Sequence, residues 1–243
     1  MGPLRVAASI CQGRQITKWQ KDLPYGQGDV RLLQAAYAAM IKQVDDQLGR
    51  ILDALEVSGQ RDNTIVIFTS DHGEMLGDHG LIQKGCRFYE GLVRVPLIFS
   101  WPGHIKAGLR SDALVELSDK APTLLQLVDE EVPGHMTGKS LLPILKGDAS
   151  PSYHRDFVRC EYYDALQAPD GTFATMYRDQ QYKLVVYHGR AYGELYDLEE
   201  DPDEFDNQWE TPAFIATRAK LMKSSFDASM LAMDRGPRRI GPI

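Results

Sequence analysis

The sequence has few cysteines and no long apolar run. Its three cysteines, Cys11, Cys86 and Cys160, are odd in number, which argues against a disulfide framework and fits a reducing compartment. No apolar run reaches the roughly 18 residues needed to span a membrane. The first ten residues are too short and too weakly apolar for a secretory signal. We therefore predict a cytoplasmic location, or a periplasmic or secreted one if an upstream signal exists.

Positive charge is also in short supply. The 27 Lys and Arg residues against 34 Asp and Glu residues give a formal net charge of -7, so no general attraction to nucleic acid or anionic membranes is expected. Charged residues make up 25% of the chain and hydrophobic residues 43%, which is ordinary for a globular protein. A length of 243 residues suffices for one large domain or two small ones. The composition thus predicts a globular protein whose partners are neither nucleic acids nor membranes.

Residues 30–70 combine an amphipathic helix with a buried strand. Apolar residues recur at spacings of three and four, which places the following on one helical face: Leu33, Tyr37, Met40, Ile41, Val44, Leu48, Ile51, Leu52 and Leu55. Residues 63–70 are a continuous β-branched and aromatic run, typical of a strand buried on both faces of a parallel sheet. The strand ends in the polar turn Ser70-Asp71-His72-Gly73. Ligands of open parallel sheets bind beyond the carboxyl ends of the strands, so this turn is a candidate site.

The pattern changes near residue 150. A second strand is predicted at residues 95–100 and a helix at residues 119–127, whereas the later part favours short strands separated by turns. Those strands are predicted at residues 157–161, 172–177, 182–187 and 194–197, with a closing helix at 212–230. This order is typical of a small antiparallel α+β unit. We predict two domains, residues 1–150 and residues 151–243.

Chemically versatile side chains gather in residues 69–84. They are Asp71, His72, Glu74, Asp78, His79 and Lys84, interrupted by glycines that allow sharp turns. A carboxylate can hold a cation, the cation can neutralise a bound anion, and a lysine adds positive charge where negative charge develops. Other interpretations stay open. Asp71 can instead cap the turn by accepting backbone N–H bonds, Lys84 can be a surface residue, and Asp78 and His79 can lie on a solvated loop.

The same segment carries an extended family resemblance. The motif Thr-Ser-Asp-His-Gly at residues 69–73 runs on to Gln-Lys-Gly at 83–85, and further motifs follow at 88–91, 94–98, 138–147 and 194–207. In this order they resemble the type I sulfatase family of the alkaline-phosphatase-like superfamily. The resemblance implies an α/β fold, in which part of an alkaline-phosphatase-like parallel-sheet domain precedes the small antiparallel α+β subdomain. It also implies metal-dependent hydrolysis of a small-molecule or saccharide sulfate ester.

The resemblance implies roles for single residues. Asp71 is expected to be a metal ligand, with His72 at the neighbouring ligand position. Lys84 is expected to be catalytic and substrate-binding, through a sulfate oxygen or the bridging ester oxygen, and His79 is a further substrate-binding candidate. Calcium is the metal expected from the family, whereas the imidazole of His72 suits Mn²⁺ or another transition metal better. The metal and the choice between sulfate and phosphonate esters therefore stay open.

Three parts of the family's catalytic machinery are missing from the sequence: the formylglycine nucleophile, an early acidic pair that binds the metal, and an upstream general-acid histidine. The formylglycine nucleophile arises from a Cys/Ser-x-Pro-x-Arg motif, which does not occur; after Cys11 there is no proline, and Arg14 comes one position early. No histidine precedes His72 to act as general acid. Loss of a nucleophile costs many orders of magnitude in rate, so we predict a C-terminal half that is inactive alone and takes the N-terminal half as a partner. A phosphonate or phosphodiester hydrolase of the same superfamily and a non-catalytic binding module are the alternatives.

Overall fold

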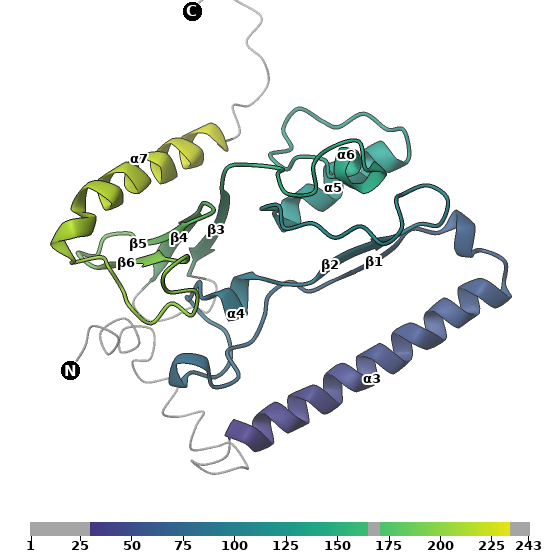
Figure 1. The fold of residues 1–243 in the computed structure, drawn as a ribbon, viewed down its shortest axis with the longest axis horizontal. Helices are drawn as coiled ribbons and strands as arrows, with labels where there is room; N and C mark the ends of the chain where they lie inside the picture. The colour runs from purple at the N-terminus through teal and green to yellow at the C-terminus, as the bar shows by residue number, and fades with distance from the viewer. Residues whose placement is uncertain (1–29, 165–170, 234–243) are drawn as a thin grey trace, which may run out of the picture. The chain divides into compact units, whose positions relative to one another are not determined.

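The computed structural model describes residues 30–164 and 171–233. The chain divides into two compact units, Met1–Ala107 and Gly108–Ile243, and each is described by itself (Figure 1). The first unit combines a long helix with a two-stranded sheet, and the second combines a four-stranded sheet with helices. This mixed α/β content confirms the predicted fold class, and the domain boundary near residue 150 stays a prediction. Within the described ranges, no helix combines the length and the apolarity needed to cross a membrane.

The helix α3 (Val30–Val57) is the predicted amphipathic helix, 28 residues long. From the sequence, Asp29 is expected to cap the start of this helix and Ser58-Gly59 to end it. Gly59 follows the helix with a left-handed φ of 68°, which favours glycine, and Asp29 lies outside the described residues. No residue of α3 is buried. Its apolar face is therefore only partly covered. Four of its side chains are each 55–57% exposed, namely Met40, Ile41, Val44 and Ile51, whereas five are half-buried: Leu33, Tyr37, Leu48, Leu52 and Leu55.

Both ends of α3 are attached within the first unit. Near the start, Gln34 Nε2 donates a hydrogen bond to the carbonyl oxygen of Leu76 (2.9 Å). Beyond the end, the 3-10 turn η1 (Arg61–Asn63) leads toward the sheet. The Arg61 guanidinium donates to the hydroxyl of Ser100 in the second strand of that sheet. These contacts attach both ends of the helix within the unit, and exposed apolar side chains occur along its whole length.

The strands β1 (Val66–Thr69) and β2 (Leu97–Ser100) form a two-stranded antiparallel sheet. β2 begins directly after Pro96, which has no N–H to donate to a strand ladder. β1 pairs antiparallel with β2, so the parallel neighbour expected for this strand is wrong, and all β1 residues are only partly buried. The connection contains the 3-10 turn η2 (Asp78–Gly80) and the single-turn helix α4 (Glu90–Val93). In the described part of the chain, no further strand pairs with the outer edges of β1 and β2.

In the second unit, the fully buried Asp119 joins separate segments of the chain. Its carboxylate accepts the backbone N–H groups of Glu116 (2.8 Å) and Lys139 (2.7 Å) and also binds the guanidinium of Arg155. A buried carboxylate is costly to fold unless it accepts such hydrogen bonds. The helical elements around it are η3 (Leu117–Asp119), α5 (Lys120–Leu127), which is the predicted helix, and α6 (Leu142–Lys146).

A four-stranded antiparallel sheet forms the rest of the second unit, as predicted. Its strands follow one another across the sheet in chain order: β3 (Val158–Tyr163), β4 (Phe173–Arg178), β5 (Tyr182–Tyr187) and β6 (Gly193–Asp197). After the 3-10 turn η4 (Pro212–Phe214), the closing helix α7 (Ile215–Leu231) packs against β4 and β5 (Figure 1). The buried residues of this core are Tyr177, Leu184, Leu195, Trp209, Leu221 and Ala228.

The other face of this sheet holds buried charged groups. Strand alternation places Lys183 and Tyr187 of β5 on the same face as Glu194 of β6. Lys183 Nζ lies 2.6 Å from Glu204 Oε1, and the Tyr187 hydroxyl donates to Glu194 Oε1 (2.8 Å). Burial raises the pKa of Glu194 to about 7; the Tyr187 hydrogen bond lowers this pKa, the Glu204 carboxylate raises it, and the Lys183 ammonium lowers it. Glu194 is therefore expected to titrate near neutral pH.

Candidate functional site

The turn after β1 places Asp71 and His72 side by side. Successive residues of a strand point to opposite faces, but this turn has already left the strand. Ser70 Oγ donates to the carbonyl oxygen of His72 (2.7 Å), and the His72 N–H donates to Asp71 Oδ1 (3.0 Å). The other carboxylate oxygen, Oδ2, lies 3.4 Å from His72 Nε2. The pair thus stands just beyond the carboxyl end of the strand, where the sequence predicts a site.

The hydrogen bonds of the His72 ring identify its protonated nitrogen. Nδ1 lies 2.8 Å from the carbonyl oxygen of Gly73. A carbonyl oxygen only accepts hydrogen bonds, so Nδ1 carries the hydrogen and the neutral ring keeps its lone pair on Nε2. Nε2 faces Asp71 Oδ2 and, at 2.7 Å, the ammonium nitrogen of Lys84. Nε2 is therefore the acceptor at which Asp71, His72 and Lys84 meet.

Asp71 is an accessible, ionised carboxylate. Its side chain is 84% exposed. The hydrogen bond from the His72 N–H holds the pKa of Asp71 below its ordinary value; desolvation raises this pKa, and the charge of Lys84 lowers it. At neutral pH this side chain is therefore an oxygen donor open to a cation.

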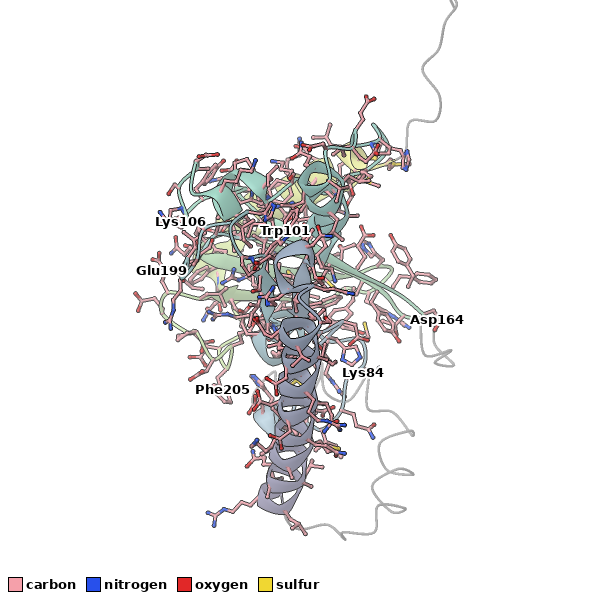
Figure 2. All side chains as sticks on the ribbon, turned by 90° about the vertical axis from the view of Figure 1, so that its right-hand side faces the viewer. Lys84, Trp101, Lys106, Asp164, Glu199 and Phe205 are labelled. Carbon is pink, nitrogen blue, oxygen red and sulfur yellow. The ribbon has the colours of Figure 1, made fainter. Side chains whose placement is uncertain are left out.

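The chain between the turn and Lys84 loops back so that Lys84 meets His72. Glu74 Oε1 accepts the backbone N–H of Gln83 and so closes the loop. Arg87 Nη1 donates to the carbonyl oxygen of Lys84 (3.2 Å) and holds the following backbone (Figure 2 labels Lys84). The loop contains three non-glycine residues with left-handed φ, namely Leu76 (48°), His79 (54°) and Gln83 (64°). Non-glycine residues keep a left-handed φ only where the surrounding structure stabilises it. The conformation of this loop is therefore well defined, and it determines where Lys84 lies.

Gly73 fastens the turn to α4. Its N–H donates to the carbonyl oxygen of Leu92 (2.8 Å). A Cβ at this position would lie 1.9 Å from the carbonyl oxygen of Gly91, a distance that no real side chain tolerates. Glycine is therefore needed here because two backbone segments approach closely.

The structure brings together three of the four predicted site residues, Asp71, His72 and Lys84. The ring of His79 stacks on Tyr89, with centroids 4.0 Å apart and an interplanar angle of 15°. A role for His79 in substrate binding stays a prediction.

Glu74 and Arg87 position Lys84, and sequence reasoning did not single them out for this. Both act on backbone groups whose places depend on the folded loop, so no spacing rule reveals them.

The Asp71 and His72 pair fits a divalent cation as two of its ligands. A carboxylate oxygen and an unprotonated imidazole nitrogen lie close together, and a backbone carbonyl holds the other ring nitrogen, as is usual for metal-binding histidines. Across residues 30–164 and 171–233, no group of three or more His, Cys, Asp and Glu side chains could hold a metal ion. A full coordination shell therefore needs ligands beyond this pair.

Comparison with known protein families covers most of the chain. Residues 77–229 match the family described as N-sulphoglucosamine sulphohydrolase, C-terminal. Residues 12–130 match the sulfatase family. The two matches overlap across the loop that carries Lys84.

The similar curated proteins are sulfatases and a related superfamily member. The chain is 35% identical over 206 residues to the N-acetylglucosamine-6-O-sulfatase of Bacteroides thetaiotaomicron, covering 83% of this chain and 36% of that protein. It is 37% identical over 204 residues to the multifunctional alkaline phosphatase superfamily protein PehA of Trinickia caryophylli, covering 78% and 39%. Arylsulfatase K of Xenopus laevis is 32% identical over 213 residues, covering 84% and 39%. The chain thus spans well under half the length of these relatives.

Solved structures give the same result for the fold. A protein in complex with its substrate D-glucosamine-2-N,6-O-disulfate matches with a TM-score of 0.76 and 31% identity, over 93% of this chain and 47% of that chain. A phosphonate monoester hydrolase of Agrobacterium radiobacter matches with a TM-score of 0.76 and 32% identity, over 85% and 43%. These likenesses confirm the alkaline-phosphatase-like fold. The chain belongs to the sulfatase family.

Proposed function

We propose that the chain supplies one part of the active site of a metal-dependent sulfuric ester hydrolase. The observation that carries this proposal is the pair of atoms Asp71 Oδ2 and His72 Nε2, 3.4 Å apart, with the ring hydrogen held on Nδ1 by Gly73. Ligand atoms that share a divalent cation at roughly 2.0–2.5 Å lie about 3 Å from one another. Asp71 and His72 would then be two of the metal's ligands, and Lys84 would contact the substrate.

Calcium is the metal that we infer from the family, and Mn²⁺ is the alternative that the nitrogen of His72 favours. When bound, the metal would supply positive charge against the oxygens of the sulfate ester. Asp71 is suited to this role because its carboxylate is 84% exposed and the hydrogen bond from the His72 N–H lowers its pKa, which favours the ionised form. His72 is suited to bind the same metal because Nε2, the ring nitrogen with the lone pair, lies beside the Asp71 carboxylate oxygen.

Lys84 would be released to the substrate when a cation binds. Its ammonium now donates to His72 Nε2 at 2.7 Å. One lone pair cannot accept this hydrogen and bind a cation at the same time, so Lys84 would be free to turn away from His72 if Nε2 held the metal. A freed ammonium beside the metal can donate to a sulfate oxygen or to the bridging ester oxygen, where negative charge builds up.

A sulfated saccharide is the substrate class that we infer. One relative is an N-acetylglucosamine-6-O-sulfatase, and one solved neighbour contains a disulfated glucosamine as its substrate. Because the formylglycine motif does not occur in this sequence, turnover needs a nucleophile from a further segment. The chain alone should therefore bind metal weakly and should not hydrolyse sulfate esters at an enzyme-like rate.

Paramagnetic Mn²⁺ tests the metal site on the chain as it stands. Titration followed by nuclear magnetic resonance should broaden the ring signals of His72 first, because broadening needs only weak and transient binding. The exposed His104 of the same unit serves as the internal control. Asp71→Asn should weaken the effect at His72 by about tenfold, the order seen when a group supporting a metal site is lost. Equal broadening at His72 and His104 would show that Asp71 and His72 do not form a metal site.

Catalysis is tested by completing the enzyme. The chain would be co-expressed with the N-terminal part of the Bacteroides thetaiotaomicron relative, and sulfate release from N-acetylglucosamine 6-sulfate would be measured. Lys84→Ala should slow this reaction by about 100-fold or more, the effect of losing one charge-stabilising donor. Lys106→Ala removes an exposed lysine of the same unit and should leave the rate unchanged. Equal rates for the two variants would exclude Lys84 from catalysis. In a second assay of the completed enzyme, faster hydrolysis of an aryl phosphonate ester than of an aryl sulfate ester would identify a phosphonate hydrolase.

A further inference from the structure

The helix α7 has apolar side chains on two sides. One side packs on the four-stranded sheet and buries Leu221 and Ala228 (Figure 1). At about 100° per residue, a second apolar set falls within an arc of about 80°, roughly 130° around the helix from the buried side. We call this set the outer face of α7, and its residues are Ile215, Ala219, Met222, Phe226 and Met230.

The outer face is open in the structure. Phe226 is 64% exposed, Ile215 54%, Met230 52% and Met222 42%. Met233, in the turn that follows the helix, is 60% exposed and extends the stripe. Single apolar residues are normal on a protein surface, whereas a continuous stripe along one helix indicates a surface for a partner. A helix with apolar residues on two sides is normally buried between two layers, so the outer face calls for a second layer.

The order of residues along the outer face suits a second copy of α7 that runs in the opposite direction. In a two-fold pair, residue i contacts residue j and residue j contacts residue i. Suppose that Met222 of one copy lies opposite Phe226 of the other. Ile215 is then level with Met233, and the small Ala219 is level with a serine. Large side chains thus meet at the centre and at both ends, and the small residues between them let the helices approach closely.

The charged residues beside the outer face also fit this arrangement. Lys223 and Asp227 lie on one flank of the stripe and form an exposed ion pair, with Nζ 2.5 Å from Oδ2. An antiparallel pair brings this flank of both helices together. Lys223 of one copy is then only about 3 Å along the axis from Asp227 of the other, since these residues are two positions apart in level. Each lysine lies between its own aspartate and that of the second copy, so opposite charges alternate across the interface.

The size of the stripe sets the expected strength of such a pair. Side chains of this kind that are about half open expose roughly 100 Å² each, so two copies would cover about 1,000 Å² in total. This area is at the lower limit for a specific interface, so we expect a Kd of about 10 µM. We propose that the outer face of α7 is the interface of a two-fold dimer of this chain, in which the two α7 helices run antiparallel. This inference does not depend on the proposed function.

Sedimentation equilibrium of the full 243-residue chain, between about 1 and 100 µM, would measure the dimer. Phe226→Lys places an ammonium group in the outer face and should raise the Kd by at least about 30-fold. Phe205→Lys makes the same change at a phenylalanine of the same unit that lies outside α7 and is 51% exposed, and it should leave the Kd within about threefold. Circular dichroism of each variant verifies that the fold is kept.

A mixture of two variants tests the direction of the helices. Met222→Glu alone should weaken the dimer, as Phe226→Lys does, because each places a charge against an apolar side chain. In a heterodimer of the two variants, the new carboxylate of one chain faces the new ammonium of the other, and one unchanged contact remains. Native mass spectrometry of an equimolar mixture should therefore show at least about tenfold more heterodimer than either homodimer.

Four results would overturn the proposal. A chain that stays monomeric up to about 100 µM has no such dimer. A dimer that persists in Phe226→Lys but dissociates in Val44→Asp would place the interface on α3. Loss of the dimer on co-expression with the N-terminal part of the Bacteroides thetaiotaomicron N-acetylglucosamine-6-O-sulfatase would show that this segment covers α7 instead. A mixture without excess heterodimer would refute the antiparallel contact between Met222 and Phe226.

Discussion

Replacing Glu194 with glutamine should remove a pH-dependent loss of stability from the second unit. Burial raises the pKa of Glu194 to about 7 in the folded protein, against 4.5 for an ordinary glutamate. The folded state therefore binds this proton more tightly, and the resulting stability is fully present below about pH 4.5 and is lost as the pH rises through about 7. At about 1.4 kcal/mol for each tenfold change in proton affinity, the loss is about 3 kcal/mol by about pH 8. Glutamine keeps an oxygen that can accept the Tyr187 hydroxyl but carries no charge.

Urea unfolding followed by circular dichroism, at several pH values between about 4.5 and 8, would measure this effect. The free energy of unfolding of Glu194→Gln, relative to the unmodified chain, should grow by about 3 kcal/mol across that range. Glu199→Gln makes the same chemical change at an exposed residue just beyond β6 and should show no such growth. If the unmodified chain and Glu194→Gln follow parallel pH profiles, ionisation of a buried Glu194 does not limit stability, and the reasoning is refuted.

Two further substitutions test the close contacts of each unit. Gly73→Ala should destabilise the first unit by about 3 kcal/mol, because the new Cβ would lie 1.9 Å from the Gly91 carbonyl oxygen, whereas Gly49→Ala, with open space on α3, should stabilise it by up to about 1 kcal/mol. Urea unfolding of both variants should give opposite signs, and equal signs would contradict the packing argument. Asp119→Asn should lower the free energy of unfolding by about 3 kcal/mol. The –NH2 group of the asparagine would then face an N–H donor in place of a carboxylate oxygen that accepts from it. Thermal unfolding against the exposed Asp112→Asn would measure this cost, and equal melting temperatures would argue against it.

Local patterns in the sequence were sufficient to locate most helices and strands. The spacing of apolar residues in α3 and the turn residues that separate the four strands of the second unit are local signals, which depend little on distant parts of the chain. The partner of β1 was not predictable in this way. A buried apolar run does not specify the direction of the neighbouring strand, and the family resemblance suggested a parallel one. The antiparallel pairing with β2 instead follows from the reversal of the chain between the two strands.

The candidate site was predictable only in part, for a similar reason. Asp71 and His72 follow directly from a polar turn at the end of an apolar strand. The contact between Lys84 and His72 depends on a loop that Glu74 closes and that contains left-handed residues other than glycine. Such residues leave no signal in the sequence, because left-handed φ is expected mainly of glycine. The resemblance therefore supplied Lys84, and only the fold shows which residues position it.

The hydrogen bond between Gly73 and Leu92 has a mechanical consequence. β1 leads into the turn, the turn is bonded to α4, and α4 leads into β2, which pairs again with β1. The chain and its hydrogen bonds thus close into a circuit that includes Asp71 and His72. A force on His72, such as the pull of a bound ion, would be shared by the whole circuit and would not simply bend one turn. The circuit would therefore act as a stiff frame for the two ligands, whatever surrounds it.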